Sequence, residues 1–413
     1  MVSEMHTDVA IIGAGPAGLT AAKELRKSIG ADVLVIDREQ EAGGIPRHSD
    51  HAGYGIRDRY SFLTGPVYAR KLVDEAASSG ATILTQTMVT HWGQGREFFT
   101  TNPSGLQRIT ADAVLLATGA RERPRSARMI PGTRPAGVYT TGELQNAVHL
   151  HKRKVGKRAV VIGGELVSWS AVMTLKEAGC AATTLVTRHR RPESYALFNI
   201  GGRVVLRPEV VTQHRVTQIL GRETVTGVEV EDLESGKRRV LACDTVVFTG
   251  DWIPDNELAR AAGLALDADS KSPVVDALGR TDEPGLFAAG NLVHPVDTAD
   301  VAALGGKGTA KNIARYLQHE ASWRADAVPI LGLDPFVWVS PHLHVRGRVP
   351  ARKRILAWVA EPIAVPRVTV RQNGKVLARR TIPWPASPGR VFRIPSSILD
   401  RADPGAGPVE LSL

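Results

Sequence analysis

The chain has 413 residues, of which 43% are hydrophobic and 23% are charged, a composition typical of a globular protein with two or three domains. Its formal net charge is +10, but the basic segments at 151–158, 187–191 and 345–354 have no interleaved aromatic residues, which argues against a nucleic-acid partner and favours an acidic protein. No apolar run approaches the roughly 20 residues that span a membrane, and the first residues show no secretory pattern, so we expect a cytoplasmic protein without a transmembrane segment.

The first predicted elements form a nucleotide-binding strand, turn and helix. Residues 9–12 are a short apolar strand, the following GAGPAG fits G-x-G-x-x-G, and residues 19–25 continue with helical periodicity. Such glycines permit a tight turn, close approach of a pyrophosphate and close helix packing, while the helix N-terminus offers free N–H groups. A second strand ends in Asp37, 19 residues after Gly18, where an acid accepts hydrogen bonds from an adenosine ribose. The predicted contacts are Gly13, Gly15, Pro16, Ala17, Gly18, Asp37 and Arg38.

Two later apolar strands end in glycine-containing turns, one at Ala117-Thr118-Gly119 and the other at Gly290-Asn291. Together with Gly43-Gly44 after Asp37, these segments resemble the FAD-binding segments of the flavoproteins with two dinucleotide domains, the pyridine nucleotide-disulfide oxidoreductase superfamily that includes thioredoxin reductase. The resemblance covers roughly residues 5–320. It implies FAD as the cofactor, with further contacts from Gly44, Val89, Thr118, Gly119, Gly290 and Asn291.

The resemblance also implies what surrounds the flavin. The last strand of the family usually ends in Gly-Asp, whose carboxylate holds the ribityl chain, and Asn291 keeps the acceptor oxygen without the charge. A helix near 301–306 would point at the pyrimidine edge, where its dipole stabilises negative charge. The loop 43–58 would run beside the isoalloxazine, so that His48 or His51 could exchange a proton; the alternative is a polar loop whose histidines are solvated or orient the chain.

A second strand–turn–helix unit at 158–175 has a degraded turn. The segment VVIGGELVSWS places Gly163, Glu165 and Ser168 where three glycines are expected. The Glu165 side chain blocks backbone approach to a phosphate, and its carboxylate repels one. Arginines at 188, 190 and 191 either hold the 2′-phosphate of NADP or form a surface cluster. Because the pyrophosphate is common to NAD and NADP, Glu165 outweighs the arginines, and we expect no tight NAD(P) binding.

The pattern of apolar and polar residues changes in the last part of the chain. Residues 335–413 alternate apolar and polar positions between prolines and glycines, with a hairpin signal at Asn373-Gly374. The predicted fold is therefore α/β, with two Rossmann-like dinucleotide-binding domains, the second inserted in the first, and a small C-terminal β-domain. We expect an FAD-binding domain at 1–122 and 245–325, an inserted NAD(P)-binding-like domain at 123–244, and a β-domain at 335–413 that is either a docking module or a cap.

The two cysteines, Cys180 and Cys243, are too far apart in sequence for a redox dithiol motif, an iron–sulfur cluster or a cysteine zinc site, and no HExxH motif occurs, so no metal site is predicted. Electrons would then come from a partner. The segment AAGNLVHPVDTAD is similar to α-type subunits of multi-subunit amine and amino-acid dehydrogenases, such as hydrogen cyanide synthase, opine dehydrogenase and sarcosine oxidase. That resemblance implies a D-amino-acid-oxidase-type flavoprotein partner and, in some complexes, a small [2Fe–2S] protein. Many such subunits carry a cysteine-rich C-terminal segment, which is missing here.

Three functions stay open at this point. The first is an FAD-dependent oxidoreductase subunit that transfers electrons within a multi-subunit dehydrogenase, and not a disulfide reductase. The second is a self-sufficient NAD(P)H-dependent flavin reductase. The third is a non-catalytic assembly subunit stabilised by a nucleotide, since some relatives of this kind hold a non-redox adenine nucleotide.

Overall fold

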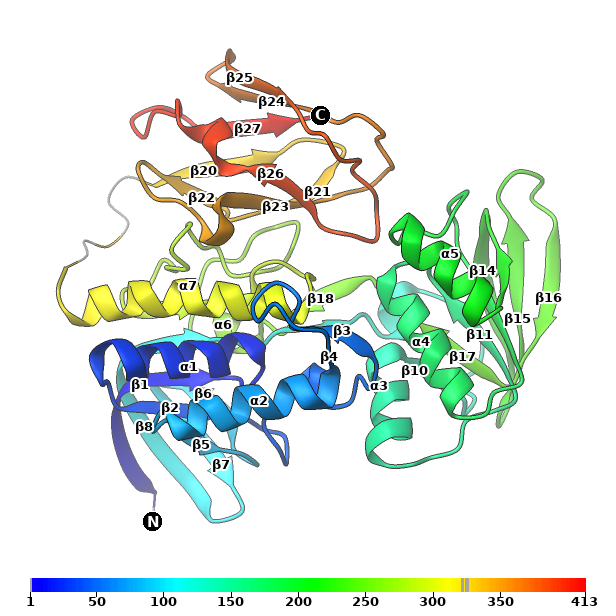
Figure 1. Cartoon of the computed structure of the whole chain (residues 1–413), viewed down its shortest axis with the longest axis horizontal. Coiled ribbons are helices and arrows are strands. Elements are labelled where there is room, and N and C mark those ends of the chain that lie inside the picture. Colours follow the sequence, from blue (N-terminus) through cyan, green and yellow to red (C-terminus); the bar gives the residue numbers. More distant parts are fainter. Residues whose placement is uncertain (1, 321–322, 324–326) are drawn as a thin grey trace.

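The structure is a computed structural model that describes residues 2–320, 323 and 327–413. Figure 1 shows three bodies: a first domain coloured blue to yellow, a second domain in green beside it, and a C-terminal β-domain in orange and red above the first. The fold is the predicted one, with parallel sheets in two Rossmann-like domains followed by mainly antiparallel sheets. None of the helices in the described residues is long and apolar enough to cross a membrane.

The first domain is built on a seven-stranded sheet, in which a parallel half is continued by an antiparallel hairpin. Its strands follow in the order β5 (Thr82–Leu84), β2 (Val33–Ile36), β1 (Ser3–Ile12), β8 (Gly105–Leu116), β7 (Glu97–Asn102) and β6 (Met88–Trp92), and β19 (Leu286–Ala288) pairs with the end of β8. Alternate residues of β1 enter two separate apolar clusters, one on each face of the sheet. Burial on both faces explains why the central strands are continuous apolar runs.

Helices α1 (Pro16–Ile29), α2 (Gly65–Ser78) and α7 (Ala299–Leu317) cover one face of this sheet, as Figure 1 shows. The strand at 9–12 is confirmed as the C-terminal end of β1, and the helix at 19–25 as the middle of α1. Smaller elements of this domain are the pair β3 (Ala52–Tyr54) and β4 (Leu63–Thr64) and the short helix α6 (Glu257–Ala261). The predicted end of the domain at residue 325 lies outside the described residues.

The second domain contains a five-stranded parallel sheet. Its order is β10 (Val138–Thr140), β17 (Thr245–Phe248), β11 (Arg158–Ile162), β12 (Ala182–Val186) and β13 (Glu209–Val211). Helices α3 (Thr141–Gln145), α4 (Leu166–Glu177) and α5 (Ala196–Val205) and an antiparallel sheet of β14 (His214–Gly221), β15 (Val225–Asp232) and β16 (Arg238–Ala242) complete it.

Two antiparallel strands join the nucleotide domains, β9 (Ala120–Glu122) and β18 (Trp252–Pro254). The sequence predicted that the first domain resumes at residue 245, whereas β17 (Thr245–Phe248) pairs with β11 and β10 in the second sheet. The return therefore comes after Phe248, through β18. An apolar strand that is buried on both faces carries no sign of which sheet it joins, and for this reason the sequence placed the boundary too early.

The C-terminal domain is a pair of sheets that enclose one apolar cluster. One sheet has the order β22 (Leu343–Val345), β20 (Ala327–Gly332), β27 (Val409–Ser412), β24 (Arg367–Gln372) and β25 (Lys375–Thr381); the other consists of β21 (Phe336–Ser340), β23 (Arg354–Val359) and β26 (Phe392–Pro395). The structure has the predicted hairpin at Asn373-Gly374, between β24 and β25. The domain begins with β20 at Ala327, a few residues before the predicted start at 335.

Candidate functional site

The turn between β1 and α1 has the surroundings that a dinucleotide requires. A Cβ atom built on Gly13 would lie 2.4 Å from the carbonyl oxygen of Ala117, and one on Gly18 would lie 2.0 Å from that of Gly13, so both positions exclude a side chain. Gly15, in contrast, faces open space, with nothing within 4 Å of such an atom. It is the N-cap of α1 and has no side chain to bond the first N–H groups of the helix. Those groups remain free for an anion.

The acid at the end of β2 holds the turn in place. The Asp37 carboxylate accepts hydrogen bonds from the backbone N–H of Ala14 at 2.7 Å and from that of Glu39 at 2.9 Å. The backbone N–H of Gly43 donates to the Ala14 carbonyl at 2.8 Å, and a Cβ on Gly44 would lie 2.9 Å from the Cα of Gly15. The segment 37–44 therefore lies directly against the glycine turn.

Some of the other predicted cofactor residues pack near the glycine turn or bond to the segment between the two nucleotide domains, whereas others lie elsewhere. Gly290 packs on the helix α1, since a Cβ there would lie 2.7 Å from that of Ala17. Thr118 and Gly119 bond to a linker residue, because the Thr118 hydroxyl donates to the Asp255 carbonyl at 2.7 Å and the Asp255 N–H donates to that of Gly119 at 3.0 Å. In contrast, Val89 is buried in the core on the other face of the sheet, and the exposed Arg38 guanidinium lies 3.8 Å from the Asp255 carboxylate.

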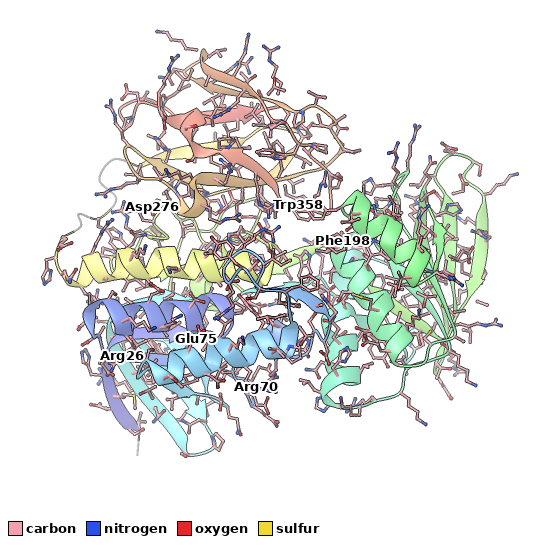
Figure 2. All side chains as sticks on the ribbon, in the orientation of Figure 1. Arg26, Arg70, Glu75, Phe198, Asp276 and Trp358 are labelled. Atoms are coloured by element: carbon pink, nitrogen blue, oxygen red, sulfur yellow. The ribbon has the colours of Figure 1, made fainter. Side chains whose placement is uncertain are left out.

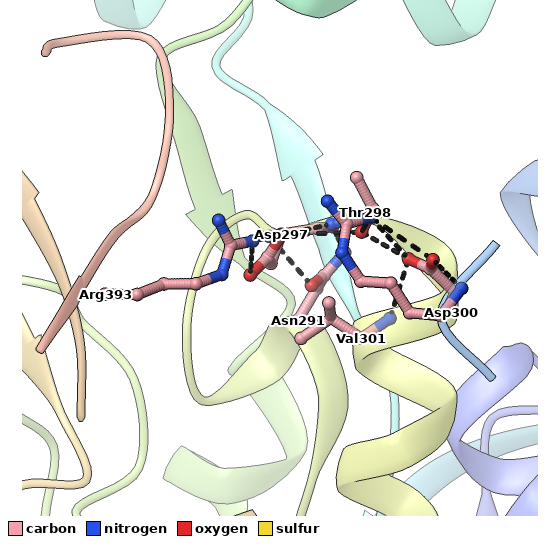
Figure 3. A network of polar contacts seen from close by, with 7 residues as sticks. Asn291, Asp297, Thr298, Asp300, Val301 and Arg393 are labelled. Atoms are coloured by element: carbon pink, nitrogen blue, oxygen red, sulfur yellow. Dashed lines mark hydrogen bonds and ion pairs between the residues drawn. The ribbon is translucent and has the colours of Figure 1, made fainter. Parts of the chain in front are cut away.

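The Asn291 amide is engaged within its own loop. Figure 3 shows it facing Asp297: its nitrogen donates to the Asp297 carbonyl at 3.1 Å, and its oxygen accepts from the Asp297 N–H at 3.2 Å. The Asp297 carboxylate in turn accepts two bonds of 2.7 Å from Arg393 on β26. The acceptor oxygen that we expected to hold a ribityl chain therefore shapes this loop, and the C-terminal domain fastens it.

The carboxylate of Asp300, in the first turn of α7, accepts a backbone hydrogen bond at the N-terminus of that helix. Asp300 is almost completely buried, and its carboxylate accepts from the N–H of Val301 at 3.0 Å (Figure 3). It also accepts from the backbone N–H of Arg57 at 2.9 Å. The Arg57 guanidinium balances its charge at 3.2 Å. The sequence placed a helix dipole here to stabilise a reduced flavin; in the structure a carboxylate–arginine pair occupies that helix end.

The loop 43–58 lies against the second domain. The Ser49 hydroxyl contacts the His51 ring at 3.0 Å and accepts a 3.3 Å bond from Gln145, whose amide also donates to Ser170 on α4. Burial and the nearby Arg47 charge lower the pKa of His48 to about 4, and burial lowers the pKa of His51 as well. Both rings are therefore neutral at pH 7, and neither holds a ready proton to donate.

Two glutamate side chains fill the turn between β11 and α4. Glu165 is the N-cap of α4, and its carboxylate accepts bonds from the hydroxyls of Ser168 at 2.8 Å and Thr249 at 2.9 Å. A second carboxylate reaches the same turn from the loop after β12: a Cβ on Gly164 would lie 2.0 Å from a carboxylate oxygen of Glu193. The space at this helix N-terminus is thus taken by two acids of the chain itself.

The C-terminal domain covers this turn. A Cβ on Gly389 would lie 2.7 Å from the Cβ of Glu193 and 2.9 Å from the Cγ of Glu165. Ser387 donates to the Glu193 carbonyl at 3.5 Å, and the Arg390 guanidinium lies 4.9 Å from the ring centre of Tyr195. The loop 387–390 therefore rests on the N-terminal end of α4, against Glu165 and Glu193.

The raised pKa values of two buried glutamates also argue against a diphosphate at this turn. Burial and the neighbouring Glu165 charge raise the pKa of Glu193 to about 8, and burial raises the pKa of Glu122, close to Glu165, to about 7. A site that already disfavours its own second negative charge disfavours a diphosphate more strongly. The arginines 188, 190 and 191 are exposed beyond this cluster. The residues at the second turn do not fit a dinucleotide, whereas those at the first turn fit one.

The chain belongs to the pyridine nucleotide-disulphide oxidoreductase family, whose model matches residues 7–306. It is therefore a member of a family of flavin-dependent oxidoreductases that bind FAD. The chain is 30% identical over 319 residues to an opine oxidase subunit of Agrobacterium tumefaciens, covering 69% of this chain and 61% of that protein. It is 27% identical over 357 residues to the alpha subunit of sarcosine oxidase from a Corynebacterium, of which it spans only 36%.

Thioredoxin reductases are similar over nearly their whole length. That of Treponema pallidum is 29% identical over 300 residues, covering 70% of this chain and 90% of that protein. Among solved structures, T. acidophilum thioredoxin reductase superposes with a TM-score of 0.64 over 76% of this chain and 99% of that one, at 24% identity. L-proline dehydrogenase from P. horikoshii superposes with a TM-score of 0.59 over 78% and 58%, at 21% identity. At these identities the structures establish the shared fold.

Sequence reasoning missed several residues of the site. It identified Glu165 and Ser168, but not Glu193, Thr249 or Gly389, which complete the filled turn. The segment AAGNLVHPVDTAD contains Asp297, but its pair with Arg393 could not be anticipated from the sequence. The only local signal was Glu193, two residues after the arginine cluster at 188–191, a position where a carboxylate opposes phosphate binding.

Proposed function

We propose that this chain is the FAD-binding, electron-transferring subunit of a multi-subunit dehydrogenase that acts on a small amine, amino acid or hydroxy compound. The observation that carries the proposal is the filled second turn, where Glu165 and Glu193 lie beneath Gly389. A chain that binds FAD but leaves no room for a nicotinamide dinucleotide needs another source of electrons. A partner protein is that source.

The residues of the chain have distinct tasks in this proposal. FAD, when bound, accepts and releases electrons. The free N–H groups at the start of α1 and the open face of Gly15 hold its diphosphate, while Asp37 keeps the turn in the required shape. The pair of Arg393 and Asp297 fixes the C-terminal domain over the loop before α7.

Two further observations support a partner-dependent role. Two of the relatives are named as subunits, one of opine oxidase and the other of sarcosine oxidase. The chain contains only Cys180 and Cys243, without the paired cysteines of a dithiol relay, which argues against disulfide reduction. The partner that we propose is a D-amino-acid-oxidase-type flavoprotein, which oxidises the substrate; a small [2Fe–2S] protein completes the electron route, and the complex works in the cytoplasm.

The test is the spectrum of the purified full chain under anaerobic conditions. We expect flavin absorption that dithionite bleaches and that NADH and NADPH leave unchanged over minutes. In complex with the flavoprotein partner, substrate amines or amino acids should bleach it. Bleaching of the isolated chain by NADPH would instead establish the flavin reductase, with the arginines at 188–191 as the 2′-phosphate contact. A colourless protein that releases ADP or ATP on denaturation would favour an assembly subunit.

A further inference from the structure

Helix α5 (Ala196–Val205) packs on its domain with its polar and small residues. Asn199 accepts a 2.8 Å hydrogen bond from the indole N–H of Trp169 on α4 and donates to the Pro192 carbonyl at 2.9 Å. A Cβ on Gly202 would lie 2.3 Å from the Trp169 ring, so the backbone of α5 rests directly on that side chain. The face of α5 that packs on the domain is therefore formed by the amide side chain of Asn199 and by Gly202.

The apolar side chains of α5 point outward instead. Their exposed fractions are 79% for Leu197, 50% for Phe198, 64% for Ile200, 65% for Val204 and 64% for Val205. Figure 2 labels Phe198 on this helix. A surface helix normally turns its apolar stripe inward, and five large apolar side chains on ten residues form a contiguous patch of the kind that marks an interaction site. We call these five residues the α5 face.

Cationic side chains flank the α5 face along the chain. Arg190 and Arg191 precede the helix, Arg203 lies within it and Arg207 follows it, and all four are exposed. Within the described part of the chain, no carboxylate forms an ion pair with any of these four guanidinium groups. An apolar centre with an unneutralised positive rim is complementary to an apolar surface with an acidic rim.

We propose that the α5 face is the docking surface for a companion protein that presents apolar side chains surrounded by aspartate and glutamate. This inference rests on the proposed function, which requires an electron-donating partner. A second copy of this chain is a poor occupant, because two cationic rims would meet. Gly201 opens a notch in the middle of the face, with nothing within 4 Å of a Cβ built there, and a notch suits a protruding side chain better than a lipid surface.

The position of α5 also suits a partner that must be held in a fixed geometry. Tyr195, the N-cap of the helix, lies under the Arg390 guanidinium of the C-terminal domain. A partner on the α5 face would therefore sit on a helix braced by two domains, next to the closed second turn. That is the side of the molecule from which a nicotinamide dinucleotide is excluded.

The experiment compares the full chain with the variant Leu197→Gln/Ile200→Gln/Val204→Gln, each co-expressed with the D-amino-acid-oxidase-type flavoprotein encoded nearest to it in the same genome. Glutamine keeps helix propensity, and none of the three side chains packs inside. Val376→Gln, at a 44% exposed valine on β25, is the matched control. We expect the wild type and the control to co-purify with the flavoprotein and the triple variant to bind it at least about tenfold more weakly, with unchanged thermal unfolding and bound flavin.

A second variant tests the rim. Arg203→Gln should weaken association at low salt and flatten its salt dependence, while leaving binding at high salt nearly unchanged. A complex that survives both variants would overturn the docking surface and leave the proposed function standing; no complex with the wild type would overturn both. Binding of the isolated chain to vesicles of phosphatidylglycerol and phosphatidylcholine, lost in the triple variant, would assign the face to a membrane and overturn a protein partner, as would self-association through α5.

Discussion

The three glycines of the turn between β1 and α1 differ in the space around them, and substitutions at each one should therefore have different effects. Gly13 and Gly18 exclude a side chain because backbone atoms lie within 2.4 Å and 2.0 Å of a built Cβ, whereas Gly15 faces open space in an extended conformation that any residue adopts. We predict that Gly15→Val abolishes flavin binding, because its methyl groups fill the space of the diphosphate, while the apoprotein keeps its stability within about 0.5 kcal/mol.

The measurement is the flavin-to-protein absorbance ratio together with urea unfolding of the flavin-free proteins. Gly405→Ala is the control, since a Cβ there makes only ordinary contact with Asp403 at 3.6 Å and lies in the C-terminal domain. Gly18→Ala should instead unfold at distinctly lower urea concentration, because the added carbon collides with the backbone. A Gly15→Val protein with full flavin content would contradict the assignment of the cofactor to this turn.

The buried carboxylate of Glu193 gives a prediction about pH. Its pKa in the folded protein is about 8, raised by burial and by the Glu165 charge. Between its ordinary pKa and about 8, the folded protein holds a proton that the unfolded chain has released, so the free energy of unfolding falls as pH rises through this window and levels off above it. Glu193→Gln removes this dependence, because an amide does not titrate.

We therefore expect Glu193→Gln to gain stability over the wild type as pH rises from about 5 to about 8, by about 1 kcal/mol or more at the upper end, since a tenfold change in proton affinity corresponds to about 1.4 kcal/mol. Urea unfolding at several pH values provides the curve. The exposed Glu223, replaced by glutamine, should leave the pH profile of the wild type unchanged. A constant difference between Glu193→Gln and wild type at all pH values would show that Glu193 ionises normally in the fold.

At the scale of a single element, α5 has two adjacent glycines with opposite surroundings. Gly202 lies on the Trp169 ring, whereas Gly201 faces open space. Gly202→Leu should destabilise the protein by about 1–3 kcal/mol, because the side chain has to displace either the helix or the indole. Gly201→Leu should be neutral or stabilising by up to about 1 kcal/mol, because leucine is the better helix former. Thermal unfolding followed by tryptophan fluorescence separates the two; equal effects would contradict the packing of α5 on α4.

The elements of the fold differ in how far the sequence predicts them. The β1–α1 and β11–α4 units follow from local patterns, since glycine spacing and apolar periodicity are properties of adjacent residues. The place of Asp37 at the end of its strand follows for the same reason. The orientation of α5 does not follow, because its apolar residues would be expected to face inward, and the structure places Asn199 and Gly202 there instead. The contact of Gly389 with Glu165 joins residues of different domains, and no local pattern encodes it.

At the scale of the whole molecule, three parts of the chain meet at the turn between β11 and α4. Glu165 lies in the turn, Glu193 reaches it from the loop after β12, and Gly389 covers both. We therefore expect that one restored glycine does not create a nicotinamide site. We predict that Glu165→Gly shows no heat of binding in titrations with NADPH up to about 1 mM, which corresponds to a binding free energy weaker than about −4 kcal/mol. Detectable binding by this single variant would show that the loop 387–390 moves aside easily.

The C-terminal domain links the two nucleotide domains, because its β26 end binds the first domain while its 387–390 loop covers the second (Figure 1). The pair of Arg393 and Asp297 is the charged part of this link, and the Asp297 side chain is only 4% exposed.

We predict that Arg393→Met destabilises the protein by about 3 kcal/mol, because it leaves a buried carboxylate without its counter-charge. Arg393→Met/Asp297→Asn should recover most of that loss, since asparagine can still accept the hydrogen bond from the Thr298 N–H that Asp297 accepts at 2.8 Å. Urea unfolding of the wild type, both single variants and the double variant gives the coupling free energy directly, and limited proteolysis should release the C-terminal domain from Arg393→Met first. Additive losses in this cycle would mean that the domain is held by its loop on the second domain and not by the ion pair.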